Sequence, residues 1–408
     1  MGWETDHAPR QAELDGCVTC GLCLPHCPTF RLTGSEAASP RGRLAAMSAV
    51  ASGAAEVDER FEEMMGFCLQ CRACEPVCPS VVPFGRAMEG ARAEIAVQRP
   101  NRGRSGRAWL LGTALPSRPT VRAATFMAAL GQRLRLDKLP VRLLSRLSGL
   151  RRLPFAPKSR VGQIRLATGD RIGSVAVLAG CVQDVWFGSV NDAAVELLAT
   201  AGYDVTVPAS QTCCGALAAH DGAVASTERL AAANATAFAG YDLVVATAAG
   251  CSAHLAGYGE WAAAGSELAA RSADITVVIA GAIADGRLPK LPTQNRTVAM
   301  QDPCHLRHAQ RVISETREIV VAAGYEPVEI DDKGLCCGAA GVYMLSQPET
   351  SDELGRLKSD QVRASGAKLV ASANPGCEMQ LRANLGSDYE VRHPIELYAQ
   401  ALGRRAGR

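Results

Sequence analysis

Eight of the sixteen cysteines stand in two short motifs near the N-terminus. Cys17, Cys20, Cys23 and Cys27-Pro28 have the spacing C-x2-C-x2-C-x3-C-P, and Cys68, Cys71, Cys74 and Cys78-Pro79 repeat it. Two residues between ligands let a tight loop direct three thiolates to three corners of one iron-sulfur cubane, while the fourth cysteine, carried onward by the proline turn, reaches the other cubane. The spacing therefore predicts two [4Fe-4S] clusters in a bacterial-type ferredoxin arrangement.

This rule also assigns the ligands. The first cluster takes Cys17, Cys20, Cys23 and Cys78, and the second takes Cys68, Cys71, Cys74 and Cys27. A structural zinc site would be an equal alternative for one C-x2-C pair, but the longer motif occurring twice argues against it. A disulfide framework is opposed by the lack of a secretion signal at the N-terminus. Apolar residues between the ligands, such as Val18, Leu22 and Leu69, are expected to shield the clusters.

The other eight cysteines belong to an internal repeat. In each copy an apolar strand precedes a lone cysteine, a helix and a second strand follow, and Cys-Cys-Gly-Ala comes before a third strand that ends at Gly-Cys. The first copy holds Cys181, Cys213, Cys214 and Cys251, and the second holds Cys304, Cys336, Cys337 and Cys377. The lone cysteine precedes the pair by 32 residues in both copies, which predicts two pseudo-symmetric α/β units built from parallel βα elements.

Each copy resembles the cysteine-rich CCG domain, which occurs twice in one of the subunits of heterodisulfide reductase and in related oxidoreductases. That family ends on C-x2-C, whereas Cys251-Ser-Ala-His254 and Cys377-Glu-Met-Gln380 lack the last cysteine. The departure argues against the special noncubane clusters of heterodisulfide reductase. Four thiols per copy still suffice for one or two further iron-sulfur clusters. The alternative is that these cysteines are buried as small apolar side chains without metal.

Taken whole, the chain resembles the iron-sulfur subunit of glycolate oxidase (glycolate dehydrogenase). The marks that carry the resemblance are Cys213-Cys214-Gly215-Ala216-Leu217, Asp302-Pro303-Cys304 followed by His308, Leu335-Cys336-Cys337-Gly338 with Gly341, and Ser372-Ala373-Asn374-Pro375-Gly376-Cys377. The resemblance implies a subunit without catalytic residues of its own, which relays electrons toward quinone from partner flavoprotein subunits that oxidise the 2-hydroxy acid. FAD is expected only in those partners, since no glycine-rich phosphate loop follows a strand here.

Three function hypotheses remain open. The first is this electron relay, with glycerol-3-phosphate or lactate dehydrogenase systems as alternatives to glycolate, since their iron-sulfur subunits share the architecture. In the second, the CCG half itself reduces a disulfide, as in heterodisulfide reductase, and the missing last cysteines argue against it. The third is a redox-sensing binding module, which would need an exposed, labile cluster.

Composition and residue patterning indicate the overall organisation of the chain. The chain of 408 residues is 48% hydrophobic with a formal net charge of +2, which indicates a globular protein of several domains. We expect an α+β ferredoxin-like, mostly helical N-terminal module (1–98), a basic helical linker (99–171) and two α/β CCG units (172–292 and 293–408). The near-neutral charge argues against nucleic acid as a partner. We expect a cytoplasmic location, with peripheral contact to the inner face of the cytoplasmic membrane as an alternative.

Weaker features lie in the linker and beside the cysteines. Leu143, Leu144, Leu147 and Leu150 recur at near-helical spacing among arginines, which fits either a membrane-surface helix or a linker packed against the α/β core. His254, His305 and His308 neighbour ligand cysteines, where an imidazole can ligate iron, donate to a cluster or carry a proton. Trp186 and Phe187 fit either a quinone pocket or the core.

Overall fold

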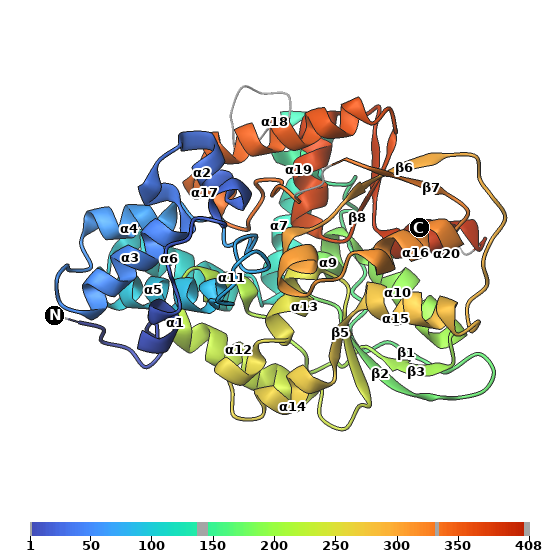
Figure 1. The fold of residues 1–408 in the computed structure, drawn as a ribbon. Helices are drawn as coiled ribbons and strands as arrows, with labels where there is room; N and C mark the ends of the chain where they lie inside the picture. Colours follow the sequence, from blue (N-terminus) through green and yellow to red (C-terminus); the bar gives the residue numbers. More distant parts are fainter. Residues whose placement is uncertain (1, 137–145, 331–333, 404–408) are drawn as a thin grey trace.

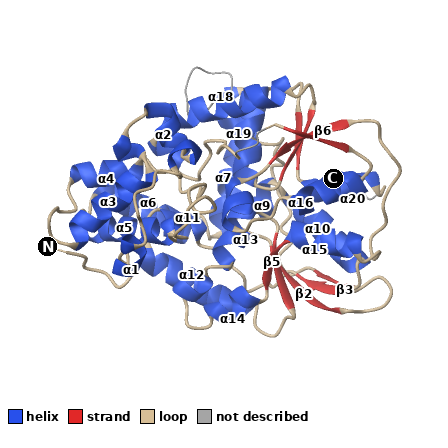
Figure 2. Ribbon diagram, in the orientation of Figure 1, coloured by secondary structure: helices blue, strands red, loops and turns tan. Residues whose placement is uncertain are grey.

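A computed structural model describes residues 2–136, 146–330 and 334–403. The N-terminal helices form one end of the molecule, and two β-sheets lie at the other end, separated by helices (Figures 1 and 2). Among the described residues, no helix is both long enough and apolar enough to span a membrane.

The N-terminal module is helical. Its helices are α1 (Gln11–Asp15), α2 (Pro28–Thr33), α3 (Pro40–Ala51), α4 (Glu59–Gly66) and α5 (Phe84–Gln98), with short 3-10 turns η1 (Leu24–His26) and η2 (Glu36–Ala38). The side chains of Ser39 and Asp58 accept hydrogen bonds from backbone N–H groups in the first turns of α3 and α4, which is why these helices begin there. Met47, Met65 and Met88 are fully buried between the helices.

The helical character of this module is confirmed, but its ferredoxin-like α+β character is not. No strand occurs in the described residues 2–136. The physical reason is that the segments between the cysteine motifs carry helix caps and helix-spaced apolar residues rather than the two-residue alternation of a half-buried strand.

The basic segment that follows is attached to the body of the molecule. It contains α6 (Arg102–Trp109), the π-helical turn η3 (Leu110–Ala114), α7 (Arg118–Arg133) and the turn η5 (Arg146–Gly149). Helix α7 packs on α9, and η5 packs on α19. Of the four leucines singled out in the sequence, Leu143, Leu144 and the side chain of Leu147 lie outside the described part. Leu150 is buried with Ala129 and Leu153, so this leucine packs against the core.

The first α/β unit is built on a five-stranded sheet of order β1-β3-β2-β4-β5. Its strands are β1 (Ile164–Arg165), β2 (Gly173–Leu178), β3 (Tyr203–Thr206), β4 (Leu243–Ala246) and β5 (Ser272–Asp274). Strand β1 is antiparallel to β3 and the other pairs are parallel. The helices are α9 (Val182–Trp186), α10 (Gly188–Thr200), α11 (Ala216–His220), α12 (Val224–Ala237), α13 (Ala249–Leu255), α14 (Gly265–Ala270) and α15 (Ile275–Ala284), with η6 (Tyr258–Glu260).

The second unit repeats this topology. Its parallel sheet has the order β7-β6-β8-β9, from β6 (Thr297–Gln301), β7 (Glu326–Glu329), β8 (Leu369–Ser372) and β9 (Glu390–Arg392). The helices are η7 (His305–Ala309, π-helical), α16 (Ser314–Ala322), α17 (Tyr343–Ser346), α18 (Pro348–Ala364), α19 (Pro375–Leu385) and α20 (Pro394–Ala401). In both units the first parallel strand lies between the second and the third, with the fourth outside the third, so the predicted pseudo-symmetric α/β repeat is confirmed.

The two units share one core. Helices α10 and α15 of the first pack against α16 and α20 of the second, and these helices lie between the two sheets (Figure 1). Leu197, Ile279, Ile319 and Tyr398 are fully buried in this layer.

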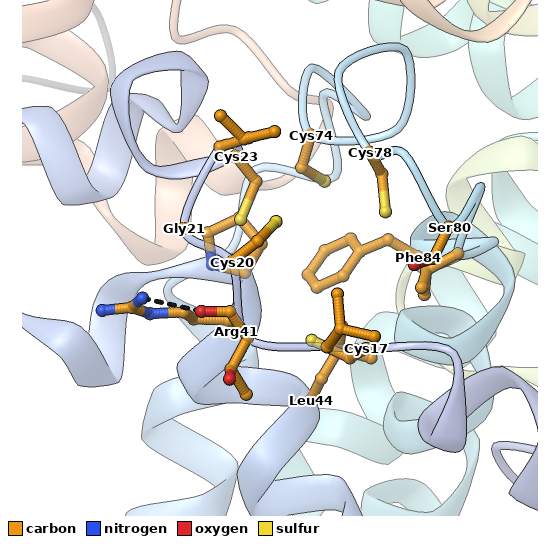
Figure 3. Close-up of a pocket in the computed structure, with 15 residues that line it drawn as sticks. Cys17, Cys20, Gly21, Cys23, Arg41, Leu44, Cys74, Cys78, Ser80 and Phe84 are labelled. Atoms are coloured by element: carbon orange, nitrogen blue, oxygen red, sulfur yellow. Dashed lines mark hydrogen bonds between the residues drawn. The ribbon is translucent and has the colours of Figure 1, made fainter.

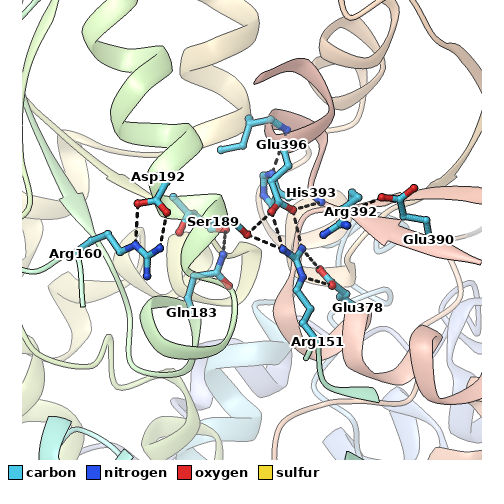
Figure 4. Close-up of polar contacts among 12 residues, drawn as sticks. Arg151, Arg160, Gln183, Ser189, Asp192, Glu378, Glu390, Arg392, His393 and Glu396 are labelled. Atoms are coloured by element: carbon cyan, nitrogen blue, oxygen red, sulfur yellow. Dashed lines mark hydrogen bonds and ion pairs between the residues drawn. The ribbon is translucent and has the colours of Figure 1, made fainter. Parts of the chain in front are cut away.

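A buried ionic network lies at the boundary between the two units (Figure 4). Arg151 donates two hydrogen bonds of 2.6 and 2.7 Å to Glu378 and two of the same lengths to Glu396. Its fifth donor reaches Ser189 at 2.8 Å. All five guanidinium N–H donors are thus used. Four of them anchor the basic segment to the second unit, and the bond to Ser189 reaches α10 of the first unit.

Candidate iron-sulfur centres

The two N-terminal cysteine loops have the same backbone conformation. In the first loop Thr19 and Gly21 have positive φ angles of 56° and 80°, and in the second Gln70 and Arg72, at the corresponding positions, have 53° and 59°. These left-handed residues flank the second cysteine of each motif and make the tight turn that points thiols to one side. Arg72 adopts this conformation although it has a Cβ, which shows how strongly the loop shape is imposed.

The first predicted ligand set surrounds one pocket. Cys17, Cys20, Cys23 and Cys78 line it, together with Cys74, Leu44 and Phe84 (Figure 3). Three of the four come from the first motif, and Cys78 comes from the end of the second. The fold thus brings Cys78 beside the first motif, although Cys74, assigned to the second cluster, lines the same pocket. Cys20 is exposed, so this pocket lies at the surface.

The second predicted set is more deeply placed. Cys27, Cys68, Cys71 and Cys74 are all buried. Burial raises the pKa of the Cys71 and Cys74 thiols well above the usual value. Neighbouring cysteine charges raise the pKa further, that of Cys304 first for Cys71 and that of Cys71 first for Cys74. Isolated thiols in such a place stay protonated, so the loss of their protons needs a metal centre to compensate the charge.

Apolar shielding differs between the two loops. Leu69 is buried, as expected, whereas Val18 and Leu22 are exposed beside the surface pocket. Val18 and Leu22 nevertheless line that pocket. They are more exposed than Leu69 because the outer side of the first loop faces solvent while the second loop is covered by the C-terminal half.

In the first α/β unit the four cysteines gather at the carboxyl ends of the strands. Cys181 follows β2, Cys213 and Cys214 follow β3, and Cys251 lies on α13 after β4. The Sγ atoms of Cys181 and Cys213 are 3.4 Å apart, and those of Cys214 and Cys251 are 3.0 Å apart. After β2 the chain crosses to β3 on one side, and after β4 it crosses to β5 on the other side. The boundary between β2 and β4 is therefore a topological switch point, the place where open α/β sheets bind ligands.

The second unit places its cysteines in the same way. Cys304 follows β6, Cys336 and Cys337 precede α17, and Cys377 lies on α19 after β8. The Sγ atoms of Cys337 and Cys377 are 3.2 Å apart, and the Gly338 N–H donates to Cys336 Sγ over 3.5 Å. Contact with Cys336 and then burial raise the pKa of the Cys304 thiol.

These donor sets suit iron-sulfur chemistry. Thiolates are the ligands of [4Fe-4S] clusters, and each predicted set brings four cysteines to one place with nearby backbone N–H groups. Within the described residues, no three or more histidine, cysteine, aspartate or glutamate side chains are placed to hold a single metal ion. The close approaches between sulfur atoms in the C-terminal half are pairwise.

The second cysteine loop touches the second α/β unit directly. Cys71 and Cys336 belong to one apolar cluster with Leu69, Leu335 and Tyr343, and Cys304 packs against it. The Nε2 atom of His305 is 3.0 Å from the Gln70 carbonyl, and Tyr343 donates to the Phe67 carbonyl over 3.2 Å. Cys71 is thus the point where the N-terminal set adjoins a C-terminal set.

A second contact joins the same loop to the first unit. Arg92 on α5 donates to the carbonyls of Cys68 and His220, each over 2.6 Å. His220 in turn lies 3.0 Å from Glu89, and its ring lies 5.3 Å from that of His305. Sequence analysis missed Glu89 and Arg92, since they occur in an ordinary helix without a motif. The only signal was that both carry charge on the helix that follows the second cysteine loop.

The histidines near the cysteines have different roles. His254 is buried, and its Nε2 has no hydrogen-bond partner among the described residues. Burial lowers the pKa of His254 to about 4 and that of His305 to about 3, so both imidazoles are neutral at pH 7. The Nε2 atom of His308 is 3.0 Å from the Gly334 carbonyl.

The two aromatic residues proposed for a quinone pocket are structural. Trp186 donates from Nε1 to Thr125 over 2.9 Å, which fixes α7 to α9. Phe187 is 1% exposed and belongs to the core shared by the two units.

Comparison with known proteins agrees with this layout. Residues 13–82 match the family of 4Fe-4S dicluster domains, and residues 175–256 and 298–382 each match the cysteine-rich CCG domain. The chain is 34% identical to the probable glycolate oxidase iron-sulfur subunit of Bacillus subtilis, over 97% of this chain and 95% of that protein. It is 30% identical to the glycolate oxidase iron-sulfur subunit of Escherichia coli, over 95% and 94%. Lactate utilization protein A of Oceanobacillus iheyensis is 27% identical over 55% of this chain and 95% of that protein.

Proposed function

Because this chain belongs to the family of glycolate oxidase iron-sulfur subunits, we propose that it is the electron-transfer subunit of a flavin-dependent 2-hydroxy-acid dehydrogenase. Substrate oxidation takes place on partner flavoproteins, which hold FAD. Reduced flavin gives up two electrons and a cubane cluster accepts one at a time. A series of clusters in this chain divides the two-electron oxidation into single steps.

The observation that carries the proposal is the pocket lined by Cys17, Cys20, Cys23 and Cys78. Three of these cysteines come from the first motif and the fourth from the second motif, which supports the cross-ligation rule. We assign the first [4Fe-4S] cluster to this set and the second to Cys68, Cys71, Cys74 and Cys27. The cluster supplies reversible one-electron chemistry, and the chain positions it, excludes water from its inner side and fixes its distance to the next centre.

Further clusters are proposed in the α/β units, on Cys181, Cys213, Cys214 and Cys251 and on Cys304, Cys336, Cys337 and Cys377. The second of these sets adjoins Cys71 through shared apolar packing. We therefore propose the order surface cluster, buried cluster, then the centre of the second unit. Cys20 and its exposed neighbours Val18 and Leu22 mark the surface where electrons enter from a flavoprotein.

The substrate is proposed to be glycolate, since both full-length relatives are named for it. Lactate is the alternative, supported by the more distant relative named for lactate utilisation, and a glycerol-3-phosphate system shares the predicted architecture. Disulfide reduction by the CCG half is less favoured, since Gln380, where the last cysteine of the family pattern would stand, donates to the Ser351 carbonyl over 2.8 Å and so serves the packing of α19. Quinone as the final acceptor and a cytoplasmic site of action complete the proposal.

The test is anaerobic iron and acid-labile sulfide analysis with EPR of the reduced chain. It is repeated on a Cys20→Ser variant and on a Cys213→Ala/Cys336→Ala double variant. Two N-terminal cubanes contain about eight irons, and each further cubane adds about four. A content near twelve to sixteen that falls to about eight in the double variant supports clusters in both halves. About eight irons in both proteins would leave the C-terminal half without clusters, and an unchanged content in Cys20→Ser would overturn the first cluster.

A further inference from the structure

Helix α7 presents an apolar stripe to solvent. Its inner face is fixed to the molecule, because Val121, Thr125 and Ala129 are buried and Thr125 accepts the hydrogen bond from Trp186. On its outer face Phe126, Met127 and Leu134 are 47%, 63% and 62% exposed. Positions 123, 126, 127, 130 and 134 follow one another at helical spacing, so these side chains form one stripe.

The surroundings of this stripe are basic. Residues 99–136 contain eight arginines and no aspartate, glutamate or lysine. Arg122, Arg133 and Arg135 are exposed along or beside the stripe. The Arg133 guanidinium lies 3.8 Å from the ring centre of Phe155, and that ring contacts Phe126 at 5.3 Å. Within residues 99–136, the aromatic, methionine and leucine side chains of the stripe are therefore accompanied by arginine and by no acidic residue.

We propose that this face of α7, with Phe155, is a docking surface for an anionic lipid bilayer. Apolar side chains bordered by arginine are the composition of helices that lie in the membrane interface with their apolar face in the acyl boundary. The charge of one sign complements the negative surface of a bilayer that contains anionic lipids, which attracts each nearby arginine.

This inference extends the proposed relay, since a lipid-dissolved quinone would then be reached without a membrane-spanning helix. Binding to vesicles requires no turnover, so its outcome is separate from that of the cluster assignment. The exposed Trp109 precedes α7 in the same acid-free segment and adds a side chain suited to the headgroup region.

The experiment is co-flotation of the intact chain with vesicles of phosphatidylcholine alone and of phosphatidylcholine with phosphatidylglycerol. We expect binding to the anionic vesicles that weakens with added salt. Phe126→Ser/Met127→Ser should weaken it about tenfold, and Arg122→Gln/Arg135→Gln should weaken it about fivefold per arginine. The matched control is Ile164→Ser/Leu166→Ser, which removes two apolar side chains that are more exposed than Phe126 and Met127 and lie elsewhere on the surface.

Unchanged iron content in each variant shows that the fold is intact. No binding to either kind of vesicle, equal binding to both kinds, or equal losses in the α7 variants and in the control would each overturn the proposal.

Discussion

Removal of Arg151 offers the sharpest test of how the basic segment is held against the second α/β unit. Its guanidinium is shared between Glu378 and Glu396, which are 2% and 1% exposed. Burial alone would raise the pKa of both carboxyls. At Glu396 the arginine, Ser189 and the His393 N–H outweigh burial and lower the pKa to about 2, whereas at Glu378, with fewer donors, burial prevails and the pKa is raised.

The size of the effect follows from these contacts. A carboxyl whose pKa falls from 4.5 to about 2 contributes roughly 3 kcal/mol of stability at neutral pH. Removing one partner of a buried ionic network leaves unpaired charge and costs about 3–5 kcal/mol. We therefore expect Arg151→Leu to lower the free energy of unfolding by about 3–5 kcal/mol and the apparent melting temperature by roughly 5 °C.

The pH dependence has a definite sign. In the native chain the contribution of Glu396 is present above about pH 4.5 and is lost as pH falls toward 2. In Arg151→Leu both carboxyls are buried without their hydrogen-bonded cation, so their pKa values rise and protonation at mildly acid pH relieves the penalty. The difference between variant and native chain should therefore shrink between pH 7 and pH 5.

The assay is thermal unfolding followed by circular dichroism at both pH values. Arg356→Leu is the control, because Arg356 makes comparable contacts with Glu353 and Asp360 on the exposed face of α18, where ion pairs contribute little. Equal melting temperatures for Arg151→Leu and the native chain at pH 7, or a difference that grows at pH 5, would refute the reasoning.

Three further predictions concern single residues. Cys74→Ser should lose the second cluster and most electron flow to an artificial acceptor, whereas the exposed Ser52→Ala should keep native iron content and turnover; equal values in the two variants would contradict the ligand assignment. Gly338→Ala should lose the cluster of the second unit, because φ is +83° and the new Cβ would lie 2.6 Å from the Ser351 carbonyl oxygen. The control Gly34→Ala has a φ of +65° but open space around it, so its EPR spectrum should show all clusters. Burial lowers the pKa of His393 to about 4, so its stabilising contribution is present above about pH 6.5 and is lost as pH falls toward 4. His393→Asn keeps a hydrogen-bond acceptor at the start of α20, and in urea unfolding its free energy of unfolding should depend on pH with a slope smaller by about one proton. An unchanged slope would argue against the buried neutral imidazole.

Much of this molecule could be predicted from local pattern. The cysteine spacing specifies tight loops because ligand geometry acts over a few residues, and both loops have the same left-handed turns at corresponding positions. The repeat predicted an apolar strand before each lone cysteine and a third strand before each Gly-Cys. All four are present as β2, β4, β6 and β8, because buried parallel strands need continuous apolar runs. The predicted membership of the glycolate oxidase iron-sulfur subunit family is confirmed.

Other features were decided only by tertiary structure. Arg151 stands in a segment interpreted as a linker, and nothing nearby in the sequence indicates its carboxylate partners, which are 227 and 245 residues away. The contact of Cys71 with Cys336 and the outward turn of Phe126 and Met127 depend in the same way on how separate elements pack. Local spacing encodes which groups a loop can present, whereas burial and pairing between distant segments arise only when the whole chain has excluded water from its core.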